Sequence, residues 1–147
     1  YREPGTHFLA VDHSRAALRV AHQNVERHAV GGRVRLAQMD LLSAAAGPLD
    51  LICANLPYIP TVALGDLDVS RWEPRGALDG GADGLDLIER LIRDAERLLA
   101  PGGVLLLEVE AGHGATAPAL ARNLLPDAQV VLIRDLAGLP RLVRIQR

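Results

Sequence analysis

Cysteine is almost absent from the 147-residue sequence, which has Cys53 alone. A single cysteine excludes a disulfide framework and a zinc site built from several cysteines, so we expect a reducing, cytoplasmic environment. No apolar run approaches the ~20 residues that a membrane helix needs, so no membrane partner is expected. Lysine is missing too: sixteen arginines stand against eighteen acidic residues. The resulting net charge of −2 argues against a protein that lives on nucleic acid.

Aromatic residues make up only 3% of the chain, so no series of stacking platforms for bases is predicted. The first residue is Tyr1 rather than methionine, which indicates a piece of a longer protein. The 49% hydrophobic and 23% charged content fits one ordinary folded domain. Neither an internal repeat nor a domain linker interrupts the sequence.

Alternating hydrophobic patterns predict a fold of alternating strands and helices. Strands are expected at His7–Asp12, Arg33–Asp40, Leu49–Leu56, Val104–Glu110, Gln129–Asp135 and Arg141–Gln146. A helix is expected after Ser14, its predicted N-cap, up to Gly31 and Gly32. Two more are expected over Asp83–Ala100, which Pro101, Gly102 and Gly103 should end, and over Ala115–Leu125. This order is typical of an α/β, Rossmann-like fold whose mostly parallel sheet is covered on both faces. The short link 136–140 predicts an antiparallel hairpin of the last two strands, and Cys53 is expected in the core.

Polar residues end three of these strands, namely Asp12, Asp40 and Asn55. Because parallel strands end on one edge of a sheet, we expect the three side chains to converge on one crevice. A carboxylate there can accept both hydroxyls of a ribose, which is the adenosine-binding interpretation of Asp12, with Asp40 on the adenine side. The alternative is that each aspartate only caps a helix or turn.

The segment Asn55-Leu56-Pro57-Tyr58 carries the sharpest signal. An asparagine side-chain carbonyl and the next main-chain carbonyl can together hold a planar NH2 group, with its nitrogen lone pair aimed at an electrophile. Pro57 would stiffen the turn, and Tyr58 would form a wall against a flat substrate group. The alternative is an Asx turn followed by a proline loop. The unpatterned segment 57–83 is too long for a plain connection, which favours a functional loop.

Asn55–Pro60, followed by Glu73–Leu85, resembles the HemK/PrmC family of class I methyltransferases. These enzymes transfer a methyl group from S-adenosylmethionine to the side-chain amide of a glutamine in peptide chain release factors. The likeness runs from Phe8–Asp12 through Leu98–Gly103 to Asp135–Arg141. The Asn-x-Pro-Tyr motif is shared with enzymes that methylate amino groups of nucleic acids, whereas the Glu73–Leu85 loop is more selective for the glutamine family.

The resemblance implies S-adenosylmethionine as cofactor and a release factor as partner. It implies catalytic roles for Asn55 and Tyr58. The implied substrate-binding residues are Asn55, Leu56, Pro57, Tyr58, Glu73 and Pro74, and the implied cofactor-binding residues are Asp12, Asp40, Leu41 and Asn55. Family members usually carry proline where this sequence has Leu56. A backbone carbonyl is the expected contact there, so the function can survive the change.

Family members also carry a helical substrate-recognition domain and a glycine-rich strand-loop-helix unit upstream of the strand that ends in Asp12. Residues 1–147 therefore resemble a partial catalytic domain without its first βα unit. In the family fold the missing strand lies in the middle of the sheet. We therefore expect self-association through the incomplete sheet, or completion by residues outside this sequence.

Two alternative functions also fit parts of the sequence. An adenine amino-group methyltransferase of DNA or RNA would use the same motif, although it would need a basic face. An NAD-binding Rossmann fragment would rest on Gly112–Ala117, which follows a predicted strand, opens a helix and has Asp135 about 20 residues further on. The five histidines lack metal-ligand spacing, so no metal is expected.

Overall fold

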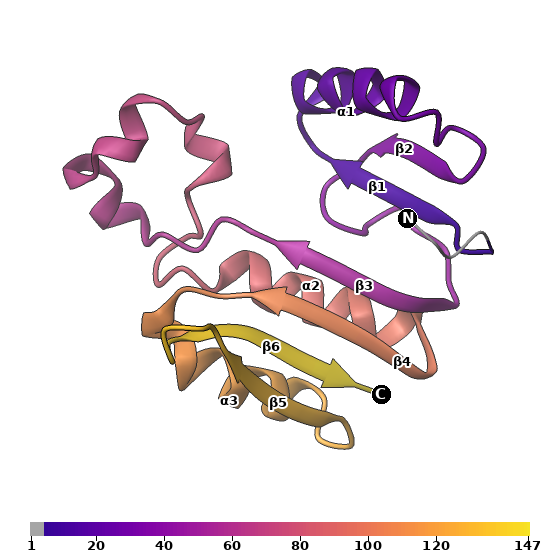
Figure 1. Cartoon of the computed structure of the whole chain (residues 1–147). Helices are drawn as coiled ribbons and strands as arrows, with labels where there is room; N and C mark the ends of the chain where they lie inside the picture. Colours follow the sequence, from indigo (N-terminus) through magenta and orange to yellow (C-terminus); the bar gives the residue numbers. More distant parts are fainter. Residues whose placement is uncertain (1–4) are drawn as a thin grey trace. The chain divides into compact units, whose positions relative to one another are not determined.

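The computed structural model describes residues 5–147, which form two compact units, residues 5–45 and residues 46–147. The first contains β1 (Phe8–Asp12), α1 (Arg15–Arg27) and β2 (Val34–Gln38). The second contains β3 (Leu49–Asn55), α2 (Asp86–Leu98), β4 (Leu99–Glu108), α3 (Thr116–Leu124), β5 (Gln129–Arg134) and β6 (Pro140–Gln146), as Figure 1 shows. No helix in the described part of the chain is both long and apolar enough to span a bilayer.

In the first unit, β1 and β2 form a parallel pair in which Asp12 lies opposite Gln38. Helix α1 connects them and begins at the predicted N-cap, where the Ser14 side chain accepts a hydrogen bond from the Ala17 amide at 3.2 Å. No residue of α1 is buried. The two strand ends that carry the predicted cofactor residues therefore share one edge of this small sheet.

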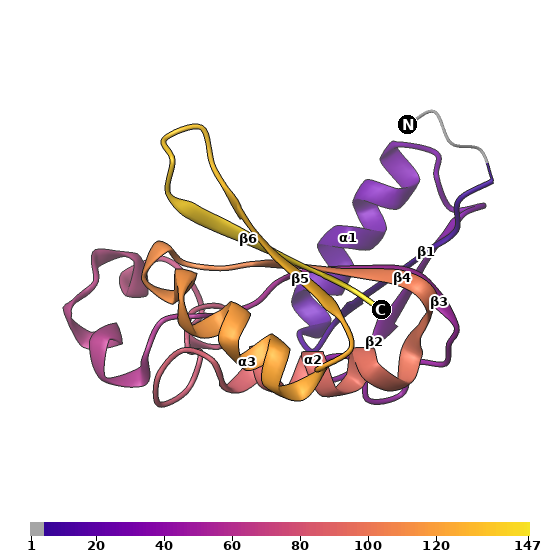
Figure 2. The same ribbon diagram turned by 90° about the horizontal axis from the view of Figure 1, so that it is seen from below.

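In the second unit the strand order is β3-β4-β6-β5. Strands β3 and β4 are parallel, as the α/β prediction requires, and β5 and β6 form the predicted antiparallel hairpin. Helices α2 and α3 lie on one face of this sheet (Figure 2). The core between these helices and the sheet contains six side chains that are each at most 1% exposed. They are Ile88 and Ile92 of α2, Leu105 and Leu107 of β4, and Val143 and Ile145 of β6.

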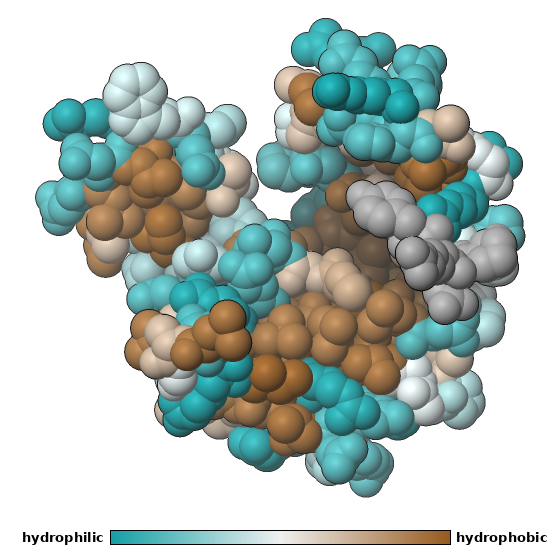
Figure 3. Space-filling model, viewed as in Figure 1, coloured by the Kyte–Doolittle hydropathy of each residue, from teal (hydrophilic) through white to brown (hydrophobic). Residues whose placement is uncertain are grey.

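The prediction of a sheet covered on both faces is wrong for the described residues of this unit. Side chains alternate across a strand, so Ile52 faces the helices and is 6% exposed, whereas its neighbour Leu51 is 54% exposed. Cys53 shares the open face and is exposed, so its assignment to the core is also wrong. Figure 3 shows apolar side chains gathered over the strands on this side. Both helices of the unit lie on the other face, and no element of this unit covers the open one.

The second predicted helix and the fourth predicted strand also have wrong bounds. Helix α2 ends at Leu98, and β4 takes in Pro101 and the two glycines after it. Leu49 pairs with Leu99, and the register then shifts, so that Leu51 pairs with Val104. A Cβ at Gly103 would lie 2.9 Å from the Leu49 carbonyl oxygen, so glycine permits this close passage. Gly102 and Gly103, which were predicted to end the helix, therefore belong to the sheet.

Candidate functional site

The candidate substrate site begins at Asn55, the last residue of β3, which pairs with Glu108 on β4. The parallel register carries Asn55 to the carboxyl edge of the sheet, as predicted. Its side chain is exposed, and the side-chain amide has no hydrogen-bond partner among the described residues. The amide is therefore available to a ligand.

A pocket of about 400 Å³ opens beside this amide. It is lined by Asn55, Leu56, Pro57, Tyr58, Ile59, Val69, Glu73, Ala77 and Leu78. Five of the six residues predicted to bind substrate are thus brought together, and Pro74, which precedes a short 3-10 turn at Arg75–Ala77, is not among the lining residues. Sequence reasoning missed the apolar residues of this wall, because an irregular loop has no hydrophobic period to reveal them.

The two ends of the long loop hold each other in place. Ile59 and Asp79 form an isolated parallel bridge, in which the Ile59 amide donates to the Leu78 carbonyl at 3.0 Å and the Gly80 amide donates to the Ile59 carbonyl at 2.8 Å. The Thr61 amide continues the pairing by donating to the Gly81 carbonyl at 2.8 Å. Backbone hydrogen bonds therefore fix the segment after Asn55 that forms the pocket wall.

Asp79 reinforces this pairing with its side chain. Its Oδ1 accepts from the Thr61 hydroxyl at 2.6 Å and from the Gly81 amide at 3.1 Å, while its Oδ2 accepts from Arg75 Nε at 3.1 Å. The hydrogen bonds from Thr61 and Gly81, and then the contact with Arg75, lower the pKa of Asp79 below its usual 3.8. The stabilisation is therefore present at neutral pH and is lost only as the pH falls through this lowered pKa.

Two glycines allow the end of the loop to pass against the backbone of Tyr58. A Cβ at Gly80 would lie 2.7 Å from the Tyr58 Cα atom. Gly84 has φ +82°, and a Cβ there would collide with the Tyr58 carbonyl oxygen. Buried His113 secures the same region, since its Nε2 donates to the Asp83 carbonyl at 3.1 Å. The sequence suggested His113 only as part of a dinucleotide motif or as one of five histidines without metal-ligand spacing, and this role was missed.

The candidate cofactor residues lie in the first unit. The Met39 amide donates to the Asp12 carbonyl at 3.2 Å, which brings the end of β1 beside the segment that carries Asp40. Asp12 Oδ1 accepts from the Ser14 amide at 2.7 Å, so the capping role considered as an alternative is real. Only this oxygen has a described partner, and the side chain is 41% exposed. Oδ2 is therefore free for a ligand.

Leu41, directly after Asp40, has a strained backbone. Its φ of +49° is in the left-handed region that residues other than Gly, Asn and Asp rarely adopt. Such strain concentrates at ligand-binding turns, where surrounding structure enforces it. The turn thus offers a defined surface next to Asp12. Because Asn55 belongs to the other unit, the predicted convergence of Asp12, Asp40 and Asn55 stays a prediction.

The dinucleotide interpretation of Gly112–Ala117 finds no support. The strand after α3 enters an antiparallel hairpin rather than a further βα unit. Asp135 closes the hairpin turn, because its Oδ1 accepts from the Ala137 amide at 2.9 Å and the Leu139 amide at 3.0 Å. The Leu139 bond is the main cause that lowers the pKa of Asp135. No group of three or more potential metal ligands occurs among residues 5–147.

Comparison with known sequences gives consistent names. No protein-family profile matches the chain. A release factor glutamine methyltransferase of Gloeobacter violaceus is 41% identical over 146 residues, which cover 95% of this chain and 50% of the relative. One from Moorella thermoacetica is 43% identical over 140 residues, covering 94% and 50%. The human MTRF1L release factor glutamine methyltransferase is 33% identical over 158 residues, covering 98% and 46%. The chain spans about half the length of these relatives.

Solved structures agree on the fold. A methyltransferase from Pyrococcus furiosus matches with a TM-score of 0.68 at 19% identity, covering 95% of this chain and 61% of that one. A ribosomal protein L11 methylase from Lactobacillus delbrueckii matches with a TM-score of 0.63 at 16% identity, covering 94% and 55%. The predicted Rossmann-like, class I methyltransferase fold is confirmed.

Removing the Asp79 carboxylate should loosen the loop. Asp79→Ala deletes acceptors for Thr61, Gly81 and Arg75, so trypsin should cleave after Arg75 several-fold faster at neutral pH, because cleavage follows local opening. Asp68→Ala is the matched control, because Asp68 contacts only exposed Arg71 at 3.5 Å. Mass spectrometry of timed digests measures both. Equal cleavage rates in the two variants would show that the backbone bridge alone holds the loop.

Proposed function

We propose that this chain, which belongs to the family of release factor glutamine methyltransferases, binds S-adenosylmethionine and takes part in methylating the side-chain amide nitrogen of a glutamine in a peptide chain release factor. The observation that carries the proposal is the unpartnered side-chain amide of Asn55 in the lining of the 400 Å³ pocket. The names of relatives that match nearly the whole of this chain support the choice of substrate.

The residues of the pocket are suited to a neutral amide. Asn55 Oδ1 accepts a hydrogen bond from the glutamine NH2 group, and the Leu56 carbonyl accepts the second. Both acceptors lie on the side where positive charge develops on nitrogen, which they stabilise. Holding the amide in this orientation can supply roughly 7 to 11 kcal/mol of the barrier. Tyr58 forms the wall of the slot, and Glu73 and Pro74 contact the substrate chain around it.

The cofactor residues fit an adenosine. The free Oδ2 of Asp12 accepts ribose hydroxyls while Oδ1 keeps its cap, and Asp40 and Leu41 border the adenine. Bound there, S-adenosylmethionine would supply an electrophilic methyl group to the amide nitrogen. The proton on the methylated nitrogen leaves without a dedicated base, because the methylated amide nitrogen is strongly acidic.

An adenine methyltransferase of nucleic acid fits the pocket less well. The only charged side chain in its lining is Glu73, and none of the lining residues is an arginine. A negative charge at this position repels a phosphate backbone, whose neutralisation by basic side chains dominates nucleic-acid affinity. The uncharged glutamine amide has no such cost.

Asn55→Ala should reduce methyl transfer to a glutamine peptide by at least about a hundredfold in the full-length protein, the scale of losing one positioned transition-state partner. The measurement is incorporation of labelled methyl groups into the peptide. Asn123→Ala, an exposed asparagine on α3, is the control and should keep wild-type turnover. Full activity of Asn55→Ala would remove Asn55 from the catalytic residues.

Asp12→Ala should weaken S-adenosylmethionine binding by about 1.5 to 3 kcal/mol, the range for hydrogen bonds to a charged group. Isothermal calorimetry measures this affinity, with exposed Asp127→Ala as the matched control. Unchanged affinity for the Asp12 variant would leave this residue with its capping role alone.

We also propose that the 147-residue chain self-associates through its open strand edges. Strands β1 and β3 each pair with a single described strand, and Phe8, Leu9 and Leu51 on them are 45 to 54% exposed. Unpaired edges with apolar side chains recruit other strands. Sedimentation velocity should therefore show a mass that rises with concentration, together with weak cofactor binding. A monodisperse monomer that binds S-adenosylmethionine at low micromolar concentration would contradict this.

A further inference from the structure

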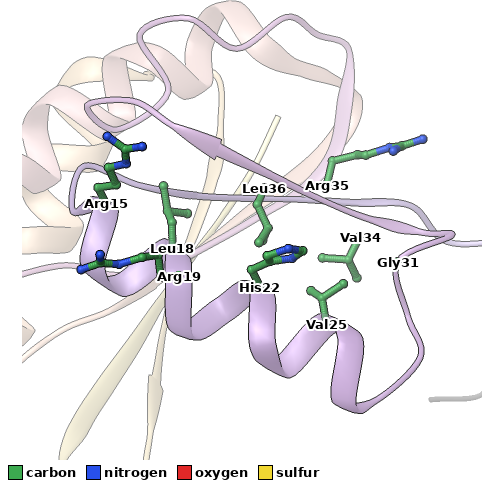
Figure 4. A pocket seen from close by; sticks show the side chains of 9 residues that line it. All are labelled: Arg15, Leu18, Arg19, His22, Val25, Gly31, Val34, Arg35 and Leu36. Carbon is green, nitrogen blue, oxygen red and sulfur yellow. The ribbon is translucent and has the colours of Figure 1, made fainter.

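A second hollow, of about 520 Å³, lies in the first unit between α1 and β2. Figure 4 shows Leu18 and Val25 of α1 facing Val34 and Leu36 of β2 across it, with His22 between them. All four aliphatic side chains are only half-buried. The hollow therefore has an apolar lining that the described residues leave open, and the proposed transferase chemistry uses none of it.

One edge of β2 is also unoccupied by any described strand. Its partner β1 takes the other edge, where the Phe8 amide donates to the Arg33 carbonyl at 2.8 Å and Met39 donates to Asp12. Along a parallel strand, alternate residues direct their backbone groups to alternate sides. Since residues 33 and 39 face β1, the even-numbered Leu36 and Gln38 direct their N–H and C=O groups to the open edge. An extended segment can pair there.

The same region is strongly basic. Residues 15–35 contain five arginines and a single acidic residue, Glu26. Arg15, Arg19 and Arg35 line the hollow, and none of them forms an ion pair with a described residue. Glu26 lies beside His22 at 3.7 Å. The net charge of −2 for the whole chain thus conceals a local surface that is complementary to carboxylates.

The side chains of β2 place the apolar lining on one face of the strand and positive charge on the other. Figure 4 shows Val34 and Leu36 pointing toward α1, whereas Arg35 points away from it. A strand added at the open edge alternates in the same way, so one set of its side chains enters the apolar hollow and the other set lies beside Arg35. Arg15 and Arg19 extend from the first turns of α1 and add positive charge along the hollow.

We propose that the open edge of β2 binds an extended segment of a protein partner in which aliphatic side chains alternate with aspartate or glutamate. Backbone pairing with Leu36 and Gln38 holds the segment, the aliphatic side chains fill the hollow under α1, and Arg35 selects the carboxylates. The proposal is independent of the transferase function. A nucleic acid fits less well, because the lining contains no phenylalanine, tyrosine or tryptophan on which a base could stack.

The first test measures fluorescence anisotropy of a labelled peptide of alternating glutamate and valine with the full chain. A peptide with lysine in place of glutamate should bind at least about tenfold more weakly, because charge complementarity selects the partner. A single-stranded oligonucleotide of equal charge should also bind more weakly. Equal or tighter binding of the lysine peptide or the oligonucleotide overturns the proposal.

Backbone pairing is tested with the unaltered protein and two methylated peptides. One carries N-methyl groups on its valines, the other on its glutamates, so that each lacks the N–H donors of one edge. Exactly one of the two edges can face β2, so one peptide should lose at least about tenfold in affinity and the other should keep most of it. Retained affinity in both would show that no strand is added.

The location is tested with Arg35→Glu, which should weaken binding of the glutamate-valine peptide at least about tenfold. Arg27→Glu is the matched control, because Arg27 lies on α1 outside the hollow and should leave affinity within about twofold. Thermal unfolding shows whether both variants fold; if Arg35→Glu does not, Arg35→Gln replaces it. Unchanged affinity in the folded Arg35 variant places the peptide elsewhere and overturns the proposal.

Discussion

The candidate active site depends on one short piece of backbone pairing, the bridge between Ile59 and Asp79. A segment of more than twenty residues between β3 and α2 would otherwise have no fixed path. The bridge joins its two ends, so that Tyr58 stands against Gly80 and Gly84, and the intervening turns close over the pocket. The Asp79 carboxylate then adds three hydrogen bonds to a pairing that the backbone has already begun.

The sheet supplies the other half of this arrangement. Parallel pairing of β3 with β4 places Asn55 at the carboxyl end of the strands, directly before the long loop. Asn55 therefore joins a hydrogen-bonded strand to the loop that lines the pocket. The Asn55 amide gains no partner from the protein itself. A polar group that is positioned but not satisfied is suited to bind a ligand, because binding then costs little reorganisation.

Sequence reasoning succeeded where a local pattern has one physical cause. Ser14 was recognised as a cap, and the short link before Pro140 as a hairpin turn, because few residues fit either role. It failed where the outcome depends on distant neighbours. Cys53 lies in an apolar run, but its burial depends on which elements cover that face of the sheet. The loop wall formed by residues such as Val69 had no periodic signal at all.

The net charge of the whole chain does not describe the charge around either proposed binding site. Residues 1–45 contain six arginines and four acidic residues, whereas residues 46–147 contain ten and fourteen, so the two units carry formal charges of +2 and −4. The proposed amide pocket lies in the acidic unit and the open edge of β2 in the basic one. Screening limits surface electrostatics to about 10 Å in salt, so a ligand responds to the local balance around Glu73 or Arg35 rather than to the total of −2.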